Sequence, residues 1–261
     1  MAKIKSILNY PNNLLNKISF NKNYLNSSIG DHIRKKCNEK FNQNNSKGLT
    51  EMISDVVLSV GFIKLPNLDE NFLNNILSEY NYLINNYKKL NVDFQEEEGV
   101  CVRAVPIWNL NPKNFHYSFN FFKNNFFYEI AEIFFKEKNI ENFSFNNDAF
   151  FHKTTATKKP LSGAYHYDIR PTLKFWLYLN DIHEKNGPMS VEKNSSKKNQ
   201  NLNQKKINDG INLVEVNDNN CEKVIGTKGT ILIHDTNSSH KANNVDVNEE
   251  RNIIRAHSWQ I

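Results

Sequence analysis

The chain has 261 residues, 39% of them hydrophobic and 12% aromatic, a composition that supports a folded core in one large domain. Its net charge of +5 comes from 33 basic and 28 acidic residues, and because the lysines are scattered, the charge does not favour a nucleic-acid-binding protein. Three cysteines far apart in the sequence, Cys37, Cys101 and Cys221, argue against a disulfide framework or a thiolate zinc site and favour a reducing cytoplasm.

The first segment, residues 1–50, is polar and rich in Asn and Lys, and we expect an N-terminal extension without evident chemistry. Its first 18 residues begin with basic side chains but contain no continuous apolar run, and Pro11 interrupts them. This pattern predicts neither a signal peptide nor a membrane span.

The second segment, residues 51–145, is expected to be mostly helical and to support the rest of the domain. At its start the sequence predicts a helix that runs into a short strand, with Gly61 as the break between them. Residues 69–90 place apolar side chains at the spacing of an amphipathic helix, and another helix is predicted within residues 119–139. The aromatic stripe of the latter is more typical of core packing than of a ligand-binding face.

From residue 146 to residue 261 the hydrophobic pattern shortens to that of β-strands separated by turn residues. The predicted strands are residues 147–154, 173–180, 189–193, 221–226, 229–235 and 251–259. Helices followed by many short strands predict a mainly β, α+β fold. We expect a sandwich or jelly-roll core with the helical N-terminal part packed on it, in a single domain over residues 1–261.

The stretch GAYHYDIRP, residues 163–171, contains two candidate metal ligands, His166 and Asp168. In a strand, residues i and i+2 point to the same face, so the imidazole and the carboxylate could converge on one ion. The alternative is two polar side chains on a solvated strand, because a chain with 8 His and 28 acidic residues contains about one such pair by chance.

A third candidate ligand, His240, ends a polar loop that follows a predicted strand. Two His and one carboxylate on one face of an octahedron suit iron(II) and leave three positions open for other ligands. For His240 by itself, the alternative is a histidine whose hydrogen bonds are satisfied in a loop or in the core.

Two arginines open the last predicted strand, Arg251 and Arg255, and in a strand both would face the same side. A planar guanidinium pairs with both oxygens of a carboxylate, so Arg251 suits the distal carboxylate of a dicarboxylic keto acid. An exposed arginine in NEER is the alternative. Arg255 could bind an anionic group of a substrate, and the alternative is packing or a salt bridge elsewhere.

Four blocks of the second half together resemble the phytanoyl-CoA dioxygenase family of Fe(II)- and 2-oxoglutarate-dependent oxygenases, whose core is a double-stranded β-helix. The blocks are YHYD (165–168), FWLYLNDIHEKNGPMSVEKNSSK (175–197), GTKGTILIHD with the SH that follows it (226–240) and ERNIIRAHSW (250–259). In that family an Arg follows the distal His by eleven residues, as Arg251 follows His240. The resemblance covers residues 145–261 best and the preceding helices more loosely.

The resemblance implies that Fe(II) is held by His166, Asp168 and His240. It also implies that Arg251 binds the far carboxylate of 2-oxoglutarate and that Lys153 adds a second positive contact to this cosubstrate. Dioxygen would be reduced with release of succinate and CO2 while a small or medium polar metabolite is hydroxylated. Since the carboxylate ligand is present, hydroxylation is favoured over halogenation, and desaturation or ring closure stays open.

The chain also departs from the family, whose PGSHK-like turn reads EKNSSKK here, so the substrate preference is not carried over. The basic stretch 193–206 predicts a solvated loop, and the longer stretch 193–213 is a candidate lid or a disordered insertion. Beside the ligands, Tyr165 and Arg170 are candidate substrate contacts. We expect a small-molecule substrate and neither nucleic acid nor a membrane as partner; a cupin-like binding module without catalysis or with another metal is the alternative.

Overall fold

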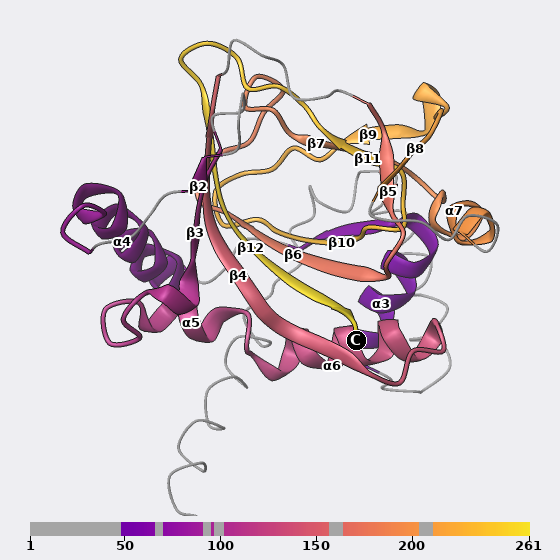
Figure 1. Ribbon diagram of the computed structural model, residues 1–261, viewed down its shortest axis with the longest axis horizontal. Coiled ribbons are helices and arrows are strands. Elements are labelled where there is room, and N and C mark those ends of the chain that lie inside the picture. Colours follow the sequence, from indigo (N-terminus) through magenta and orange to yellow (C-terminus); the bar gives the residue numbers. More distant parts are fainter. Residues whose placement is uncertain (1–47, 66–69, 91–94, 97–101, 157–163, 204–210) are drawn as a thin grey trace, which may run out of the picture.

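A computed structural model describes residues 48–65, 70–90, 95–96, 102–156, 164–203 and 211–261. In this part of the chain two antiparallel β-sheets lie together, and helices pack beside the larger one (Figure 1). The mixed fold with antiparallel sheets confirms the α+β prediction. No helix among these residues combines the length and the apolar character that crossing a membrane would require.

The helical part begins as the sequence predicts. Helix α3 (Leu49–Val60) ends at Gly61, whose φ of 105° is a left-handed conformation that favours glycine. Strand β1 (Phe62–Leu65) starts at the next residue. A Cβ at position 61 would also collide with the side chain of Ser238, so this turn requires glycine for two reasons.

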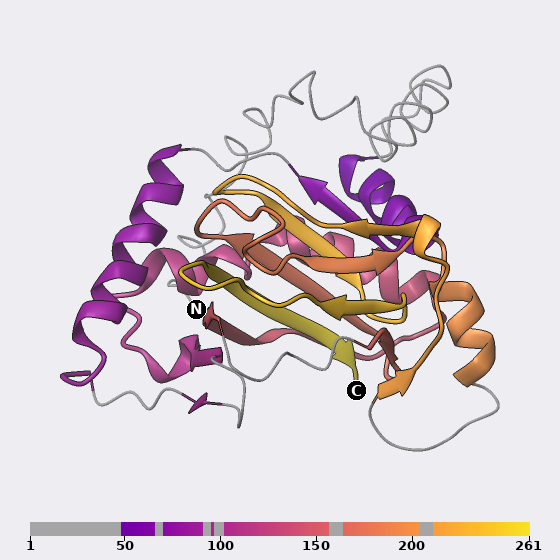
Figure 2. The ribbon, with the colours of Figure 1, turned by 90° about the horizontal axis from the view of Figure 1, so that it is seen from above.

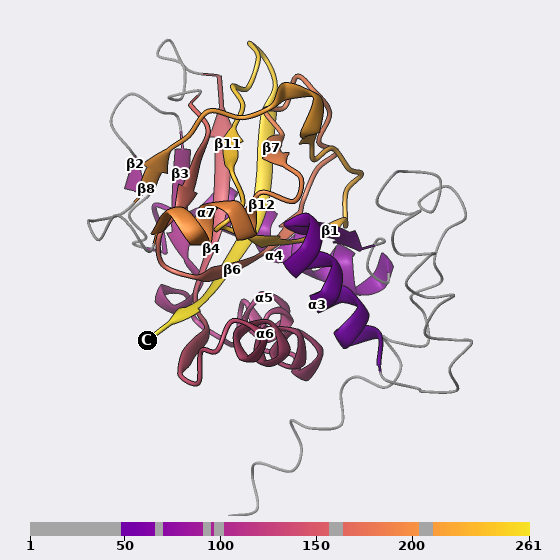
Figure 3. The ribbon, with the colours of Figure 1, turned by 90° about the vertical axis from the view of Figure 1, so that its right-hand side faces the viewer.

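The other helices of the first half bury their apolar faces against the larger sheet. They are α4 (Glu70–Asn86), α5 (His116–Phe121) and α6 (Asn125–Glu137), with a short 3-10 turn, η2 (Ile107–Asn109). The aromatic stripe of α6 lies in the core, as predicted. Phe127 packs edge to face on Phe175, a residue of the larger sheet, with the two ring centres 5.3 Å apart. Figure 3 shows α5 and α6 on one side of this sheet, and Figure 2 shows α4 at the opposite end of the molecule from α7.

In the described residues the larger sheet has seven strands in the order β1-β10-β6-β12-β4-β3-β2, and the smaller has five in the order β8-β5-β11-β7-β9. Besides β1, the larger sheet contains β2 (Gln95–Glu96), β3 (Val102–Pro106), β4 (Phe143–Thr155), β6 (Thr172–Tyr178), β10 (Ile231–Asp235) and β12 (Glu250–Gln260). The smaller sheet contains β5 (His166–Asp168), β7 (Met189–Glu192), β8 (Ile211–Leu213), β9 (Cys221–Lys223) and β11 (His240–Ala242).

The strand register sorts the side chains of the larger sheet onto two faces. Arg255 of β12 lies opposite Trp176 of β6 and Phe150 of β4, and directly paired residues share a face. This inner face is turned toward the smaller sheet, because Lys174 contacts Asp168 across the gap. Alternate residues of the same strands form the outer face, which packs on the helices.

The prediction of a solvated loop over residues 193–206 is wrong for its central part. Residues 196–203 form a helix, α7 (Ser196–Asn203), and Asn199 is fully buried. The helix forms because its polar side chains find buried hydrogen-bond partners in a loop of the core. Residues 204–210 and the N-terminal residues 1–47 lie outside the described part of the chain.

Candidate metal centre

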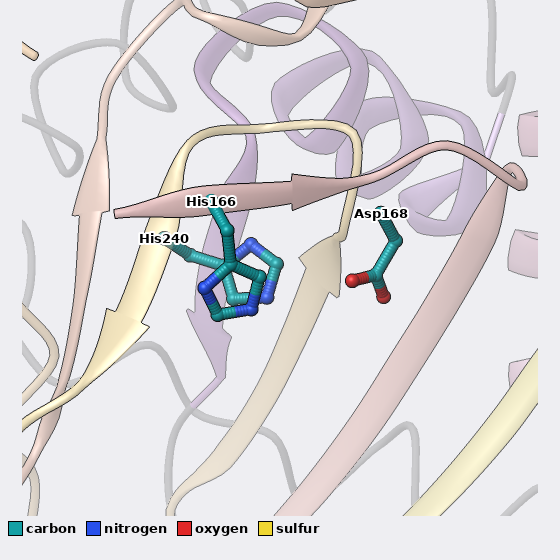
Figure 4. A group of neighbouring side chains, drawn as sticks. All are labelled: His166, Asp168 and His240. Atoms are coloured by element: carbon teal, nitrogen blue, oxygen red, sulfur yellow. The ribbon is translucent and has the colours of Figure 1, made fainter. Parts of the chain in front are cut away.

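The three predicted metal ligands come together in the structure. His166 and Asp168 lie on β5, and His240 begins β11 directly opposite His166. One potential ligand atom of each residue lies within 4.8 Å of those of the other two. The two imidazole ring centres are 4.5 Å apart, and the carboxylate points toward the same space from the same strand as His166 (Figure 4).

The hydrogen bond of His240 leaves one ring nitrogen available to a metal. Its Nδ1 lies 2.8 Å from the carbonyl oxygen of Ser238. Because a carbonyl only accepts, Nδ1 carries the proton and Nε2 keeps its lone pair. Burial, aided by the charge of Lys174, lowers the pKa of His240 to about 3. The ring is therefore neutral at physiological pH, the form in which histidine binds metals.

The carboxylate of Asp168 is held by a half-buried lysine. Its Oδ2 accepts a hydrogen bond from Nζ of Lys174 at 3.0 Å. Burial by itself would raise the pKa of Asp168, but the charge of Lys174, together with hydrogen bonds from Lys174 and Thr236, outweighs burial, so the pKa lies below its ordinary value. The group is ionised at neutral pH, and Lys174 occupies one of its oxygens. The carboxylate points toward the two imidazoles (Figure 4).

Both predicted arginines lie on the inner face of the larger sheet. Arg251 is 7% exposed and its guanidinium donates to the carbonyl oxygen of Gly187. Burial lowers its pKa. Arg255 is half-buried, with its guanidinium carbon 5.8 Å from the ring centre of Trp176. Together with Lys174, these residues place three cationic side chains on one face.

The structure does not bring Lys153 to this face. Lys153 of β4 lies opposite Asn252, the neighbour of Arg251, so its side chain is on the outer face. There its ammonium pairs with Glu250 at 2.6 Å. The position that the resemblance implied for a cosubstrate contact therefore points to the other side of the sheet from Arg251.

The two candidate substrate contacts, Tyr165 and Arg170, lie at the margins of the candidate metal centre. Tyr165 contacts the side chain of Cys221, and Lys241, the residue after the histidine of β11, lies with its ammonium 4.5 Å from the tyrosine ring centre. Successive strand residues alternate, so Tyr165 lies on the side of the smaller sheet away from the ligands. Arg170 is exposed, with its guanidinium carbon 5.5 Å from the ring centre of Trp259.

Several inner-face residues were not singled out from the sequence. Lys174 is the one with a recognisable signal, because it is the charged residue of a mostly apolar strand, where a lysine favours a carboxylate partner. His234 is fully buried, with its ring centre 4.6 Å from that of His240. Burial also holds the pKa of His152 and His257 well below the usual value for histidine. These rings are therefore neutral.

Comparison by sequence finds no relatives, since no family model and no curated protein matches the chain. Comparison of structures does. The epimerase SnoN in complex with Fe3+, alpha ketoglutarate and nogalamycin RO has a TM-score of 0.59 and 14% identity, over 81% of this chain and 83% of that chain. This chain shares the fold of that structure.

Two further structures support the same fold. HygX from Streptomyces hygroscopicus, with nickel, 2-oxoglutarate and hygromycin B bound, has a TM-score of 0.54 and 12% identity, over 80% of this chain and 86% of that chain. EctD from S. alaskensis, with 2-oxoglutarate and 5-hydroxyectoine, has a TM-score of 0.56 and 12% identity, over 80% of this chain and 75% of that chain. At such identities the likeness concerns the fold.

Proposed function

We propose that the chain is an Fe(II)- and 2-oxoglutarate-dependent dioxygenase of the phytanoyl-CoA dioxygenase type. Its core would be a double-stranded β-helix over residues 146–261, within a single domain that includes helical support over 51–145 and an extension over 1–50. The observation that carries the proposal is the convergence of the two histidines and the aspartate from separate segments. The fold supports it, because SnoN was crystallised with Fe3+ and alpha ketoglutarate, and HygX with nickel and 2-oxoglutarate.

The donor set fits iron(II). His166 and His240 offer imidazole nitrogens, Asp168 offers an ionised carboxylate oxygen, and the described part of the chain brings no thiolate into the cluster. Bound iron would supply one-electron oxidation chemistry and coordination positions for the cosubstrate and dioxygen. The protein's own part is to present His240 as a neutral imidazole in a fixed tautomer and to keep the carboxylate of Asp168 ionised through Lys174.

The inner-face cations would bind the organic anions. Arg251 would pair with the distal carboxylate of 2-oxoglutarate, since a buried guanidinium gains most from a bidentate partner. Lys153 is not part of this proposal because it faces the helices. Arg255, on the same inner face as Arg251, would bind an anionic group of the substrate. Tyr165 and Arg170 are not part of this proposal either, because Tyr165 lies on the side of the smaller sheet away from the ligands and Arg170 is exposed.

We infer hydroxylation of a small or medium polar metabolite, with release of succinate and CO2. Sugars, amino-acid derivatives, natural products and acyl esters fall in this class. Because Asp168 supplies a carboxylate where a halogenase would leave room for halide, hydroxylation is favoured over halogenation.

The test is iron-dependent turnover of 2-oxoglutarate by the purified protein. We expect slow succinate formation with Fe(II) and oxygen, inhibition by zinc, and no succinate from the His166→Ala variant. A binding module would bind metal without releasing succinate. Succinate formation that is indifferent to Fe(II), or absent although iron and 2-oxoglutarate bind, would overturn the proposed function.

A further inference from the structure

The stretch from the last residue of β10 to the first residue of β11, residues 235–240 (DTNSSH), is polar throughout and lies in the interior. Its first five residues have no exposed surface, and His240 is 6% exposed. Buried polar groups are unfavourable unless they are hydrogen-bonded, so such a loop is retained where its partners are well placed. We call residues 235–240 the ligand loop, because they end in the metal-ligand histidine.

The ligand loop is tied to the other ligand-bearing segment through the backbone of Asp168. The backbone N–H of Asp168 donates to the carbonyl oxygen of Thr236 at 2.9 Å. The carbonyl oxygen of Asp168 accepts from the side-chain amide of Asn237 at 2.8 Å. Both backbone polar groups of Asp168 therefore end on the ligand loop, which fixes that residue relative to His240.

Asn237 is itself held by a buried lysine at the end of α6. Its Oδ1 accepts from Nζ of Lys138 at 2.8 Å, and the same ammonium pairs with Asp235 at 2.9 Å. The side chains of Lys138 and Asp235 are 6% and 0% exposed. Asp235 also accepts from the hydroxyl of Ser196 at 2.5 Å. Since one end of the Asn237 amide is fixed by Lys138, its other end is aimed at Asp168.

Helix α7 and the residue before it add further contacts to the ligand loop. The side-chain amide of Asn199 donates to the carbonyl oxygen of Asn237 at 2.8 Å and to the hydroxyl of Ser239 at 3.0 Å. The N–H of Ser239 donates to the hydroxyl of Ser195 at 2.8 Å. The stretch in which this sequence departs from the family's turn thus supplies contacts to the ligand loop.

We propose that Asn237 is a positioning residue of the metal centre, anchored by Lys138, which sets the spacing between Asp168 and His240. The inference rests on the proposed function. Asn237 contacts the backbone of Asp168, not its carboxylate, and Lys138 acts only through Asn237 and Asp235. Loss of a contact that orients a metal ligand typically lowers metal affinity about 10- to 100-fold.

The test is the affinity of the metal-free protein for Co(II), followed by visible absorption without substrate or oxygen. Asn237→Asp keeps a partner for Lys138 but replaces the amide donor by an acceptor that faces the carbonyl of Asp168. We expect Co(II) to bind at least ~10-fold more weakly, with a changed absorption spectrum. Lys138→Met should weaken Co(II) binding in the same direction, by a smaller factor.

The matched control is Asn146→Gly, on β4, which is the third strand away from β10 in the order of the larger sheet. Asn146 is 2% exposed, donates to the carbonyl of Phe122 at 2.7 Å and accepts from the hydroxyl of Ser258 at 2.8 Å. Glycine tolerates its φ of 43°. This variant also loses two buried side-chain hydrogen bonds, so it should unfold more easily while binding Co(II) like the wild type.

Co(II) binding by Asn237→Asp within threefold of the wild type would overturn the inference, as would an equal loss in Asn146→Gly. If Asn237→Asp does not fold, the Lys138→Met measurement decides by the same criterion. A wild-type protein that binds no Co(II) would instead overturn the proposed function, and the inference with it.

Discussion

The two faces of the larger sheet are made by alternate residues of the same strands, yet their chemistry is opposite. On the outer face Phe151, Phe175 and Ile254 are buried against the helices, with no more than 1% of their surface exposed. On the inner face the buried His152 and the half-buried Lys174 have side chains that can carry charge.

The comparison shows how the fold separates stability from chemistry. Burial of apolar surface on the outer face stabilises the sheet, by about 25 cal/mol per Å². That stabilisation offsets the unfavourable burial of polar and charged groups on the inner face. A single step along a strand changes a residue's role, as between His152 and Lys153.

The largest effect is expected from removing a proposed metal ligand on the smaller sheet. Asp168→Ala should lower iron-dependent succinate formation by roughly 10³-fold or more, because it removes the charged donor of the site. The measurement is succinate release under saturating Fe(II) and 2-oxoglutarate. His183→Ala, at an exposed histidine, is the control and should be unaffected. Retained turnover in Asp168→Ala would contradict the assigned ligand set.

The outer face is tested by Phe175→Ala. This side chain is fully buried, so its truncation should lower the free energy of unfolding by about 3–5 kcal/mol, measured by urea denaturation. The fraction that stays folded should bind Co(II) as the wild type does. A large change in Co(II) affinity would show that the two faces are not separable in this way.

Substitution of one cation from each face, Arg251 inside and Lys153 outside, tests which face binds 2-oxoglutarate. Arg251→Met should raise the KM for 2-oxoglutarate on the order of 100-fold, since it removes charge-assisted hydrogen bonds to the distal carboxylate. Lys153→Met breaks only the ion pair with Glu250 and should leave that KM unchanged. Equal effects of the two substitutions on KM would argue against an inner-face cosubstrate site.

A smaller effect is expected from the pH dependence of stability. Burial, with the charge of Arg255 as the next largest cause, holds the pKa of His152 well below 6.5. Below pH 6.5 this histidine is therefore protonated in the unfolded chain but not in the folded chain. Stability is therefore lost as the pH falls. In His152→Gln the loss in unfolding free energy between pH 7.5 and 5.5 should shrink by about 1.4 kcal/mol.

This pH effect is measured by urea denaturation of the metal-free protein at both pH values. His183→Gln, on the surface, is the matched control and should leave the pH dependence as it is. An unchanged pH dependence in His152→Gln would mean that this histidine has the same pKa in the folded and the unfolded chain, which would contradict the prediction.

Much of the architecture could be predicted from local patterns. Amphipathic spacing predicted α4, and the Gly61 break placed the end of α3, because both features act over a few neighbouring residues. The longer strands were predicted for the same reason. The strands β5, β8 and β11 span three residues each, too short for a pattern, and exist because neighbouring strands pair with them.

For the site, the sequence by itself determined the three candidate ligands and the spacing of Arg251 from His240. Only the tertiary structure decided which neighbours join them. The register of β12 on β4 turned Arg251 inward and Lys153 outward, and a one-residue shift would have exchanged them. Lys138 and Asn237 are almost a hundred residues apart in the sequence. A local sequence pattern cannot predict their contact, because it depends on how distant segments pack.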